Sequence, residues 1–210
     1  MNTTEIKLKG IIKSFDDLYK YAKKQFVEYE KLEGIEDWEE YDFSIDCSND
    51  QMKFKDILQI RCIEELTEAT HALDNEEHFY EEVTDALNFF LSAYCMLGVD
   101  FNLFENPEQI LRLYKYNSKI NLSDEKEHLW LYQNFYEIIN DIGDLCNLLK
   151  NRPWAQSNYL VSMYDFDIRS KKLWHTFWHV IGMMGINKEE VFEMFERKYL
   201  VNKWRIKTGY

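Results

Sequence analysis

The chain has 210 residues and a formal net charge of −13, with 38 acidic against 25 basic residues. This length can bury one sizeable core, so we expect a single domain over residues 1–210. The acidic balance argues against stable nucleic-acid binding, which needs clustered Lys and Arg. No apolar run reaches ~18 residues and the N-terminus has no apolar signal region, so neither a membrane span nor export is expected. Four widely spaced cysteines favour reduced thiols in a cytoplasmic protein.

Helical periodicity dominates the first half of the chain, which has few helix breakers. A first helix is predicted after Ser14, with Gly34 as its stop. The stretch "LEGIEDWEEYDFSIDCSND" loses the period and is predicted as a loop. Two further helices are then predicted, one from about Gln51 to Leu73, the other following the turn-forming Asp74-Asn75 and ending near Gly98.

The second half has the same character. Asn106 and Pro107 resemble a cap followed by Pro at the first helical position. A long helix should follow, stopped by Pro153, and further helices are predicted at Arg169 to Met184 and from Asn187 toward Arg205. Strand-like alternation is not apparent, so the predicted fold is an all-α helical bundle. The apolar positions expected to face the core in the long helix are Leu129, Tyr132, Phe135, Ile139, Ile142, Leu145 and Leu149.

The chain contains a possible internal repeat. The segments "LSAYCMLGVDFNLFENPEQILRLYKYNSKIN" and "FWHVIGMMGINKEEVFEMFERKYLVNKWR" share an apolar helix, a Gly stop, a loop and an amphipathic helix. They predict two pseudo-repeated helical units, although any two helical hairpins share these features. The acidic positions of the first unit correspond to Arg169, Lys171 and Lys172 of the second, so only the first would keep a metal site. The many aromatic apolar faces favour a homodimer.

The stretch from Glu64 to Ser92 contains many carboxylates and no Lys or Arg. Its pattern is EExxE, thirteen residues, then ExxD. Residues three or four apart share a helix face, and two antiparallel helices would bring the two sets of acids together. Such a hard-oxygen cluster suits Mg²⁺, although a solvated helix face would explain the same letters. The acids that share a helix face by this spacing are Glu65 with Glu68, Glu64 with Glu68, and Glu82 with Asp85.

The C-terminus adds a second motif, K-x3-N-x2-R-x3-G-Y, in "RKYLVNKWRIKTGY". With the acidic pattern, it resembles the all-α nucleoside triphosphate pyrophosphohydrolase superfamily, and more closely the dimeric dUTPases and phage dCTP/dUTP pyrophosphatases. The resemblance covers about 57–100 and 182–210. Like the compact phage enzymes, the chain ends at Tyr210, which leads us to expect a phage-encoded protein acting in the host cytoplasm.

The resemblance implies an activity and a role for each residue. The activity would be Mg²⁺-dependent hydrolysis of a deoxynucleoside triphosphate, dUTP first and dCTP or a modified pyrimidine next, to the monophosphate and pyrophosphate. Glu65 would orient the attacking water and, with Glu68, Glu82 and Asp85, would match the Mg²⁺ ligands, while Glu64 would be an auxiliary acid. The substrate-binding residues would be Lys198, Asn202, Arg205 and Tyr210.

The chain also departs from the family pattern. The family's Lys/Trp-rich segment between the acidic helices is replaced by "HALDNEEHFY", and Ile206 stands where Gln is usual. In dimeric dUTPases an N-terminal helix carries a uracil-reading Gln and Asn, of which only Gln25 has a counterpart here. A catalytically degenerate nucleotide-binding or regulatory protein is therefore the alternative.

Histidines leave two further possibilities open. The pairs Glu68/His71 and Glu125/His128 both spell ExxH, the signature of di-iron four-helix bundles. His175 and His179 lie four apart, as a metal-binding pair would, but helix histidines packed on aromatic residues are more common.

Overall fold

The computed structural model describes residues 7–38, 40–113, 119–149 and 161–209. Within these ranges the regular structure is helical and contains no strand, which confirms the all-α prediction. None of the described helices is both long and apolar enough to cross a bilayer. The elements are α1 (Phe15–Leu32), α2 (Ser48–Lys55), the π-helical η2 (Asp56–Cys62), α3 (Ile63–His71), α4 (Glu76–Met96), the 3₁₀ turn η3 (Phe101–Leu103), α5 (Pro107–Leu113), α6 (Glu125–Leu148), α7 (Met163–Met183) and α8 (Lys188–Thr208).

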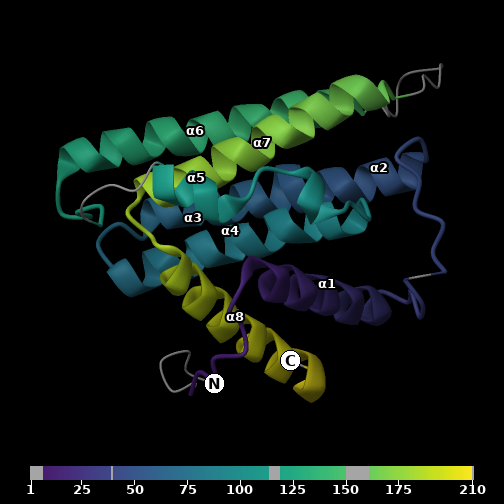
Figure 1. Ribbon diagram of the computed structural model, residues 1–210, viewed down its shortest axis with the longest axis horizontal. Coiled ribbons are helices and arrows are strands. Elements are labelled where there is room, and N and C mark those ends of the chain that lie inside the picture. The colour runs from purple at the N-terminus through teal and green to yellow at the C-terminus, as the bar shows by residue number, and fades with distance from the viewer. Residues whose placement is uncertain (1–6, 39, 114–118, 150–160, 210) are drawn as a thin grey trace.

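The helices form three layers (Figure 1). The middle layer pairs α4 with the continuous helix α2–η2–α3. Helices α6 and α7 pack together on one side of it, with α5 against α7. On the other side α1 packs on α4 and α8, and α8 crosses α4. The two helices that carry the acidic motif are therefore held in the centre of the molecule.

Aromatic packing fixes α4 against α7. The Phe90 ring stacks on Phe177 with centroids 4.1 Å apart, and the Tyr94 ring meets Trp174 edge-on at 5.1 Å. The Tyr94 hydroxyl donates to the Ser170 carbonyl at 2.7 Å, so its polar end is satisfied inside the core. Protein interiors are packed about as densely as organic crystals, so these contacts hold α4 rigidly. The face of α4 that carries the acidic side chains is therefore fixed in position.

Several predicted helix ends are confirmed. The Ser14 side chain accepts from the Asp17 amide at 3.1 Å, and Asn187 and Glu190 form a reciprocal capping box at the start of α8. The Asn106 side chain accepts from the Glu108 amide at 2.9 Å beside Pro107.

Three predictions about helices were wrong in detail. The second helix begins at Ser48, not Gln51, and contains a π-helical segment. Helix α7 begins at Met163, where Ser162 caps it, rather than at Arg169. In α6, Leu129 and Tyr132 are exposed, because the helix turns Leu131 and Ile138 toward the core, while Phe135, Ile142 and Leu145 are buried as predicted.

Other predictions are not decided by the described residues. Pro153 and Tyr210 lie outside them. The internal duplication stays a prediction. The basic residues of the second predicted unit each form an ion pair with an aspartate, in the pairs Arg169–Asp144, Lys171–Asp167 and Lys172–Asp141.

Candidate metal centre

The hairpin of α3 and α4 brings three predicted acids together. One carboxylate oxygen from each of Glu65, Glu82 and Asp85 lies within 4.8 Å of the other two. The hairpin can do this because Leu66 and Ala69 of α3 are buried, which turns the neighbouring Glu65 toward α4. On α4, Glu82 and Asp85 lie three apart and thus on one face. The structure therefore joins the two acidic sequences as their spacing predicted.

The cluster carries more negative charge than its surroundings neutralise. Burial, with hydrogen bonding to Glu82 and the charge of Asp85, raises the pKa of Glu65 to about 8. Burial also raises the pKa of Asp85 to about 6, even though the Lys198 ammonium acts in the opposite direction. Without a further cation, ionising all three acids is unfavourable.

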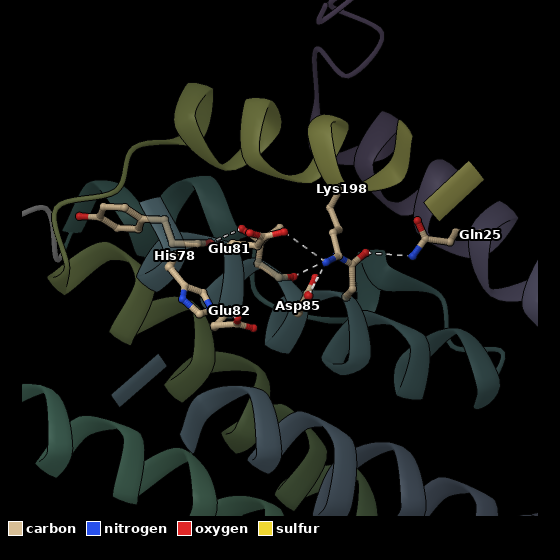
Figure 2. A network of polar contacts seen from close by, with 9 residues as sticks. Gln25, His78, Glu81, Glu82, Asp85 and Lys198 are labelled. Carbon is tan, nitrogen blue, oxygen red and sulfur yellow. Dashed lines mark hydrogen bonds and ion pairs between the residues drawn. The ribbon is translucent and has the colours of Figure 1, made fainter. Parts of the chain in front are cut away.

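Lys198 supplies part of the missing positive charge. Its buried ammonium group reaches from α8 to Asp85 Oδ2 and lies 3.9 Å from Glu81 Oε1 (Figure 2). The other oxygen of Asp85, Oδ1, is buried and has no hydrogen-bond partner among the described residues. An orphaned carboxylate oxygen beside two further acids matches the donor set that Mg²⁺ prefers, so the residues fit this ion.

His78 holds Glu82 from one helical turn away. Its Nε2 lies 2.5 Å from Glu82 Oε1, and both residues belong to α4 (Figure 2). Glu82 as a residue is only 8 % exposed. This contact fixes the orientation of Glu82, as residues behind a metal ligand commonly do.

Glu64 and Glu68 lie elsewhere on α3. Both are exposed, and neither belongs to the three-residue group. Glu68 is still close enough for its charge to raise the Glu65 pKa. Since the described structure gathers three of the four predicted ligands, the ligand role of Glu68 stays a prediction.

A cavity of about 290 Å³ opens beside the cluster. Its walls come from α1, α2, η2, α3, α4 and α8, and they include Glu65 and Asp85. Three of the four predicted substrate-binding residues, Lys198, Asn202 and Arg205, also line it. The C-terminal motif therefore meets the acidic motif at this cavity. The fourth, Tyr210, lies outside the described residues.

Amide side chains form another part of the cavity wall. Gln25 of α1 donates from Nε2 to Asn88 Oδ1 at 3.1 Å, and Asn88 donates to the Thr84 carbonyl at 2.9 Å. Gln25 is buried, and its Oε1 has no partner among the described residues. Because Gln25 lines the cavity, a rotation of its side chain would let this unpartnered oxygen accept a hydrogen bond from a ligand N–H.

Sequence reasoning missed two cations of this cavity, Lys53 and Arg61. Both precede the acidic motif on the same long helix, Lys53 by twelve and Arg61 by four residues before Glu65. Steps of four along a helix could have revealed them.

The described structure gives little support to a di-iron site or to a metal-binding histidine pair. Its group of ligand-spaced residues contains no histidine. His71 is exposed, and the His128 ring contacts the Leu122 carbonyl at 2.7 Å. His175 lies 2.8 Å from Glu105 Oε2, and its ring centroid is 6.1 Å from that of His179.

Comparisons of the chain with protein-family models, with curated proteins and with solved structures find no match in any of the three.

Proposed function

We propose that this protein is a Mg²⁺-dependent pyrophosphohydrolase that converts a deoxynucleoside triphosphate to its monophosphate and pyrophosphate. The observation that carries the proposal is the meeting of both motifs at one cavity. The acidic cluster lies at its wall beside Lys198, Asn202 and Arg205. The sequence resemblance names the reaction, and the cavity supports it because its oxygen ligands and cations are those that a phosphate chain with Mg²⁺ requires.

Glu65, Glu82 and Asp85 would hold the ion, which when bound supplies charge neutralisation for the phosphates and a more acidic water. Glu65 is the carboxylate that we assign to orient the attacking water. It lines the cavity, where a carboxylate oxygen can accept a hydrogen bond from the water and so orient it. Lys198 and Arg205 stabilise the charge that develops on the departing pyrophosphate.

The amide wall supplies the end of the cavity where a base would bind. Gln25 and Asn88 offer a carbonyl oxygen and an amide at the α1–α4 contact. Uracil presents both a ring N–H and carbonyl oxygens, which match these groups, whereas the N3 atom of cytosine carries no hydrogen. We therefore place dUTP first among the substrates, with dCTP and modified pyrimidines as alternatives.

The test is release of pyrophosphate from a panel of deoxynucleoside triphosphates, with Mg²⁺ and with a chelator. Mg²⁺-dependent turnover of one pyrimidine nucleotide is the expected result. Nucleotide binding without pyrophosphate release would support the degenerate, regulatory protein instead. Co-purifying iron with its optical bands would support the di-iron protein.

A further inference from the structure

One wall of the cavity is a row of side chains on the continuous helix α2–η2–α3. Lys53, Ile57, Arg61 and Glu65 follow one another at steps of four residues, and all four line the cavity. In an α-helix of 3.6 residues per turn, each such step rotates by about 40°. Over three steps, a row in a purely α-helical segment would turn away from the cavity.

The π-helical segment Asp56–Cys62 explains why the row stays in place. Its i→i+5 hydrogen bonds give more than four residues per turn, so steps of four rotate in the opposite sense there. The rotation of the row about the helix axis in the α-helical parts is thereby cancelled. Arg61 therefore lies on the same side of the helix as Glu65. Single π-helical turns inside α-helices occur frequently at functional sites.

Arg61 has an exposed ion pair and a contact with the Phe89 ring, and neither prevents a change of partner. Its Nε lies 3.0 Å from Asp56 Oδ2, and the two side chains are 53 % and 45 % exposed. Exposed ion pairs contribute little free energy, so an incoming anion can displace Asp56. The guanidinium has five N–H donors in a planar fork, and the bond from Nε leaves the terminal amino groups outside it.

The other cations of the cavity wall are arranged differently. Lys53 contacts Glu30 and lies 3.1 Å from Glu33, while Lys198 contacts Asp85. The segment between the acidic helices, "HALDNEEHFY", contains no Lys or Arg that could reach a phosphate. The cations available to a phosphate chain at the cluster therefore come from other walls, Lys198 and Arg205 from α8 and Arg61 from η2.

We propose that Arg61 is a substrate-binding residue that contacts the phosphate chain from the η2 wall of the cavity, while the C-terminal motif contacts it from α8. The inference rests on the proposed function. Four helical residues span about 6 Å, so a phosphate held beside Glu65 lies within reach of the Arg61 fork. On binding, Asp56 gives up its contact with Arg61 to a phosphate oxygen.

The experiment is calorimetric titration of the full-length protein with tripolyphosphate in Mg²⁺, followed by pyrophosphate release from the best nucleotide. Arg61→Gln should weaken tripolyphosphate binding by about 10- to 100-fold, as expected for loss of a charged hydrogen-bonding group. Its affinity for Mg²⁺ alone and its melting temperature should stay at the wild-type values. Asp56→Asn should tighten tripolyphosphate binding a few-fold, because it removes both a competitor and a repelling charge.

Arg112→Gln is the matched control, since Arg112 forms a similarly exposed ion pair with Glu108 on α5 and does not line this cavity. It should bind tripolyphosphate as the wild type does. Equal binding by wild type and Arg61→Gln overturns the assignment of Arg61 and leaves the proposed function standing. If the wild type neither binds tripolyphosphate nor hydrolyses any nucleotide, the proposed function fails and the role of Arg61 with it.

Discussion

At the scale of single residues, Glu65 and Asp85 are both expected to be essential but to affect stability in opposite directions. Glu65→Gln and Asp85→Asn should each lower Mg²⁺-dependent turnover by a factor on the order of 10² or more, as loss of a dominant electrostatic contact does. Steady-state pyrophosphate release would measure this. Glu77→Gln, exposed on the same helix α4, is the control and should keep full activity. Full activity in both cluster variants would show that the acidic face is only solvated.

The stability of the same two variants, measured by thermal denaturation in chelator, should separate them. Glu65→Gln removes a carboxylate whose ionisation the fold disfavours, so the melting temperature should rise. Asp85→Asn leaves the buried Lys198 ammonium without its main partner, so the melting temperature should fall. Breaking a buried pair costs about 3–5 kcal/mol, and the nearby Glu81 should hold the loss to the lower end.

The raised pKa of Glu65 also predicts a pH dependence. Between its ordinary value of 4.5 and about 8, the folded state holds the proton more tightly than the unfolded state does. The metal-free protein should therefore lose stability as pH rises through this window, and the slope should flatten above it. Mg²⁺ binding must release this proton, so apparent Mg²⁺ affinity should increase up to about pH 8. Calorimetry across pH 6–9 would test this, and Glu65→Gln should flatten both profiles.

At the scale of elements, α8 is held in place by the N-terminal segment before α1. The buried Glu196 carboxylate accepts backbone N–H bonds from Lys9, Gly10 and Ile11 at 2.5, 3.0 and 2.9 Å. Gly10 has a positive φ of 62°, which lets the three amides converge on one side chain. Since Lys198 and Asn202 follow on the same helix, this contact helps to set the cavity wall.

Glu196→Gln should destabilise the fold and release the N-terminal segment, because an amide offers one acceptor oxygen where the carboxylate offers two. The expected loss is about 1–3 kcal/mol, with faster hydrogen exchange at residues 7–13. Denaturant unfolding and exchange mass spectrometry would measure the two effects. Glu193→Gln is the control, being exposed on the same helix. Unchanged exchange in Glu196→Gln would mean that other contacts hold the segment.

At the scale of the whole molecule, the expected homodimer stays a prediction. Leu129, Tyr132 and Tyr136 are large, exposed apolar side chains that follow one another on α6 at helical spacing. Exposed apolar stripes of this kind favour association. Light scattering should give twice the mass of the chain, and Tyr136→Glu should shift the protein toward monomer. A wild-type protein that is monomeric at all concentrations would contradict the expectation.

Much of the fold and part of the site could be predicted from local chemistry. Helix periodicity, the caps at Ser14 and Asn187 and the stop at Gly98 depend on neighbouring residues, and the structure places them as expected. The pairing of Glu65 with Glu82 and Asp85 also follows from local rules, since a short turn between two helices forces them to be antiparallel. Which face of each helix is buried was less predictable. Leu129 and Glu68 are exposed because packing against neighbouring helices, not periodicity, sets the rotation of each helix about its axis.

The sequence by itself determined the helical class, several helix ends and the two motifs, because each depends on residues a few positions apart. Only the tertiary structure decided that Gln25, Arg61 and Asn88 share a cavity with both motifs. These residues come from separate helices or from a π-helical segment that changes the helical phase, and no local pattern encodes that meeting. The contact of Lys198 with Asp85 likewise joins residues 113 positions apart, and it forms because α8 crosses α4.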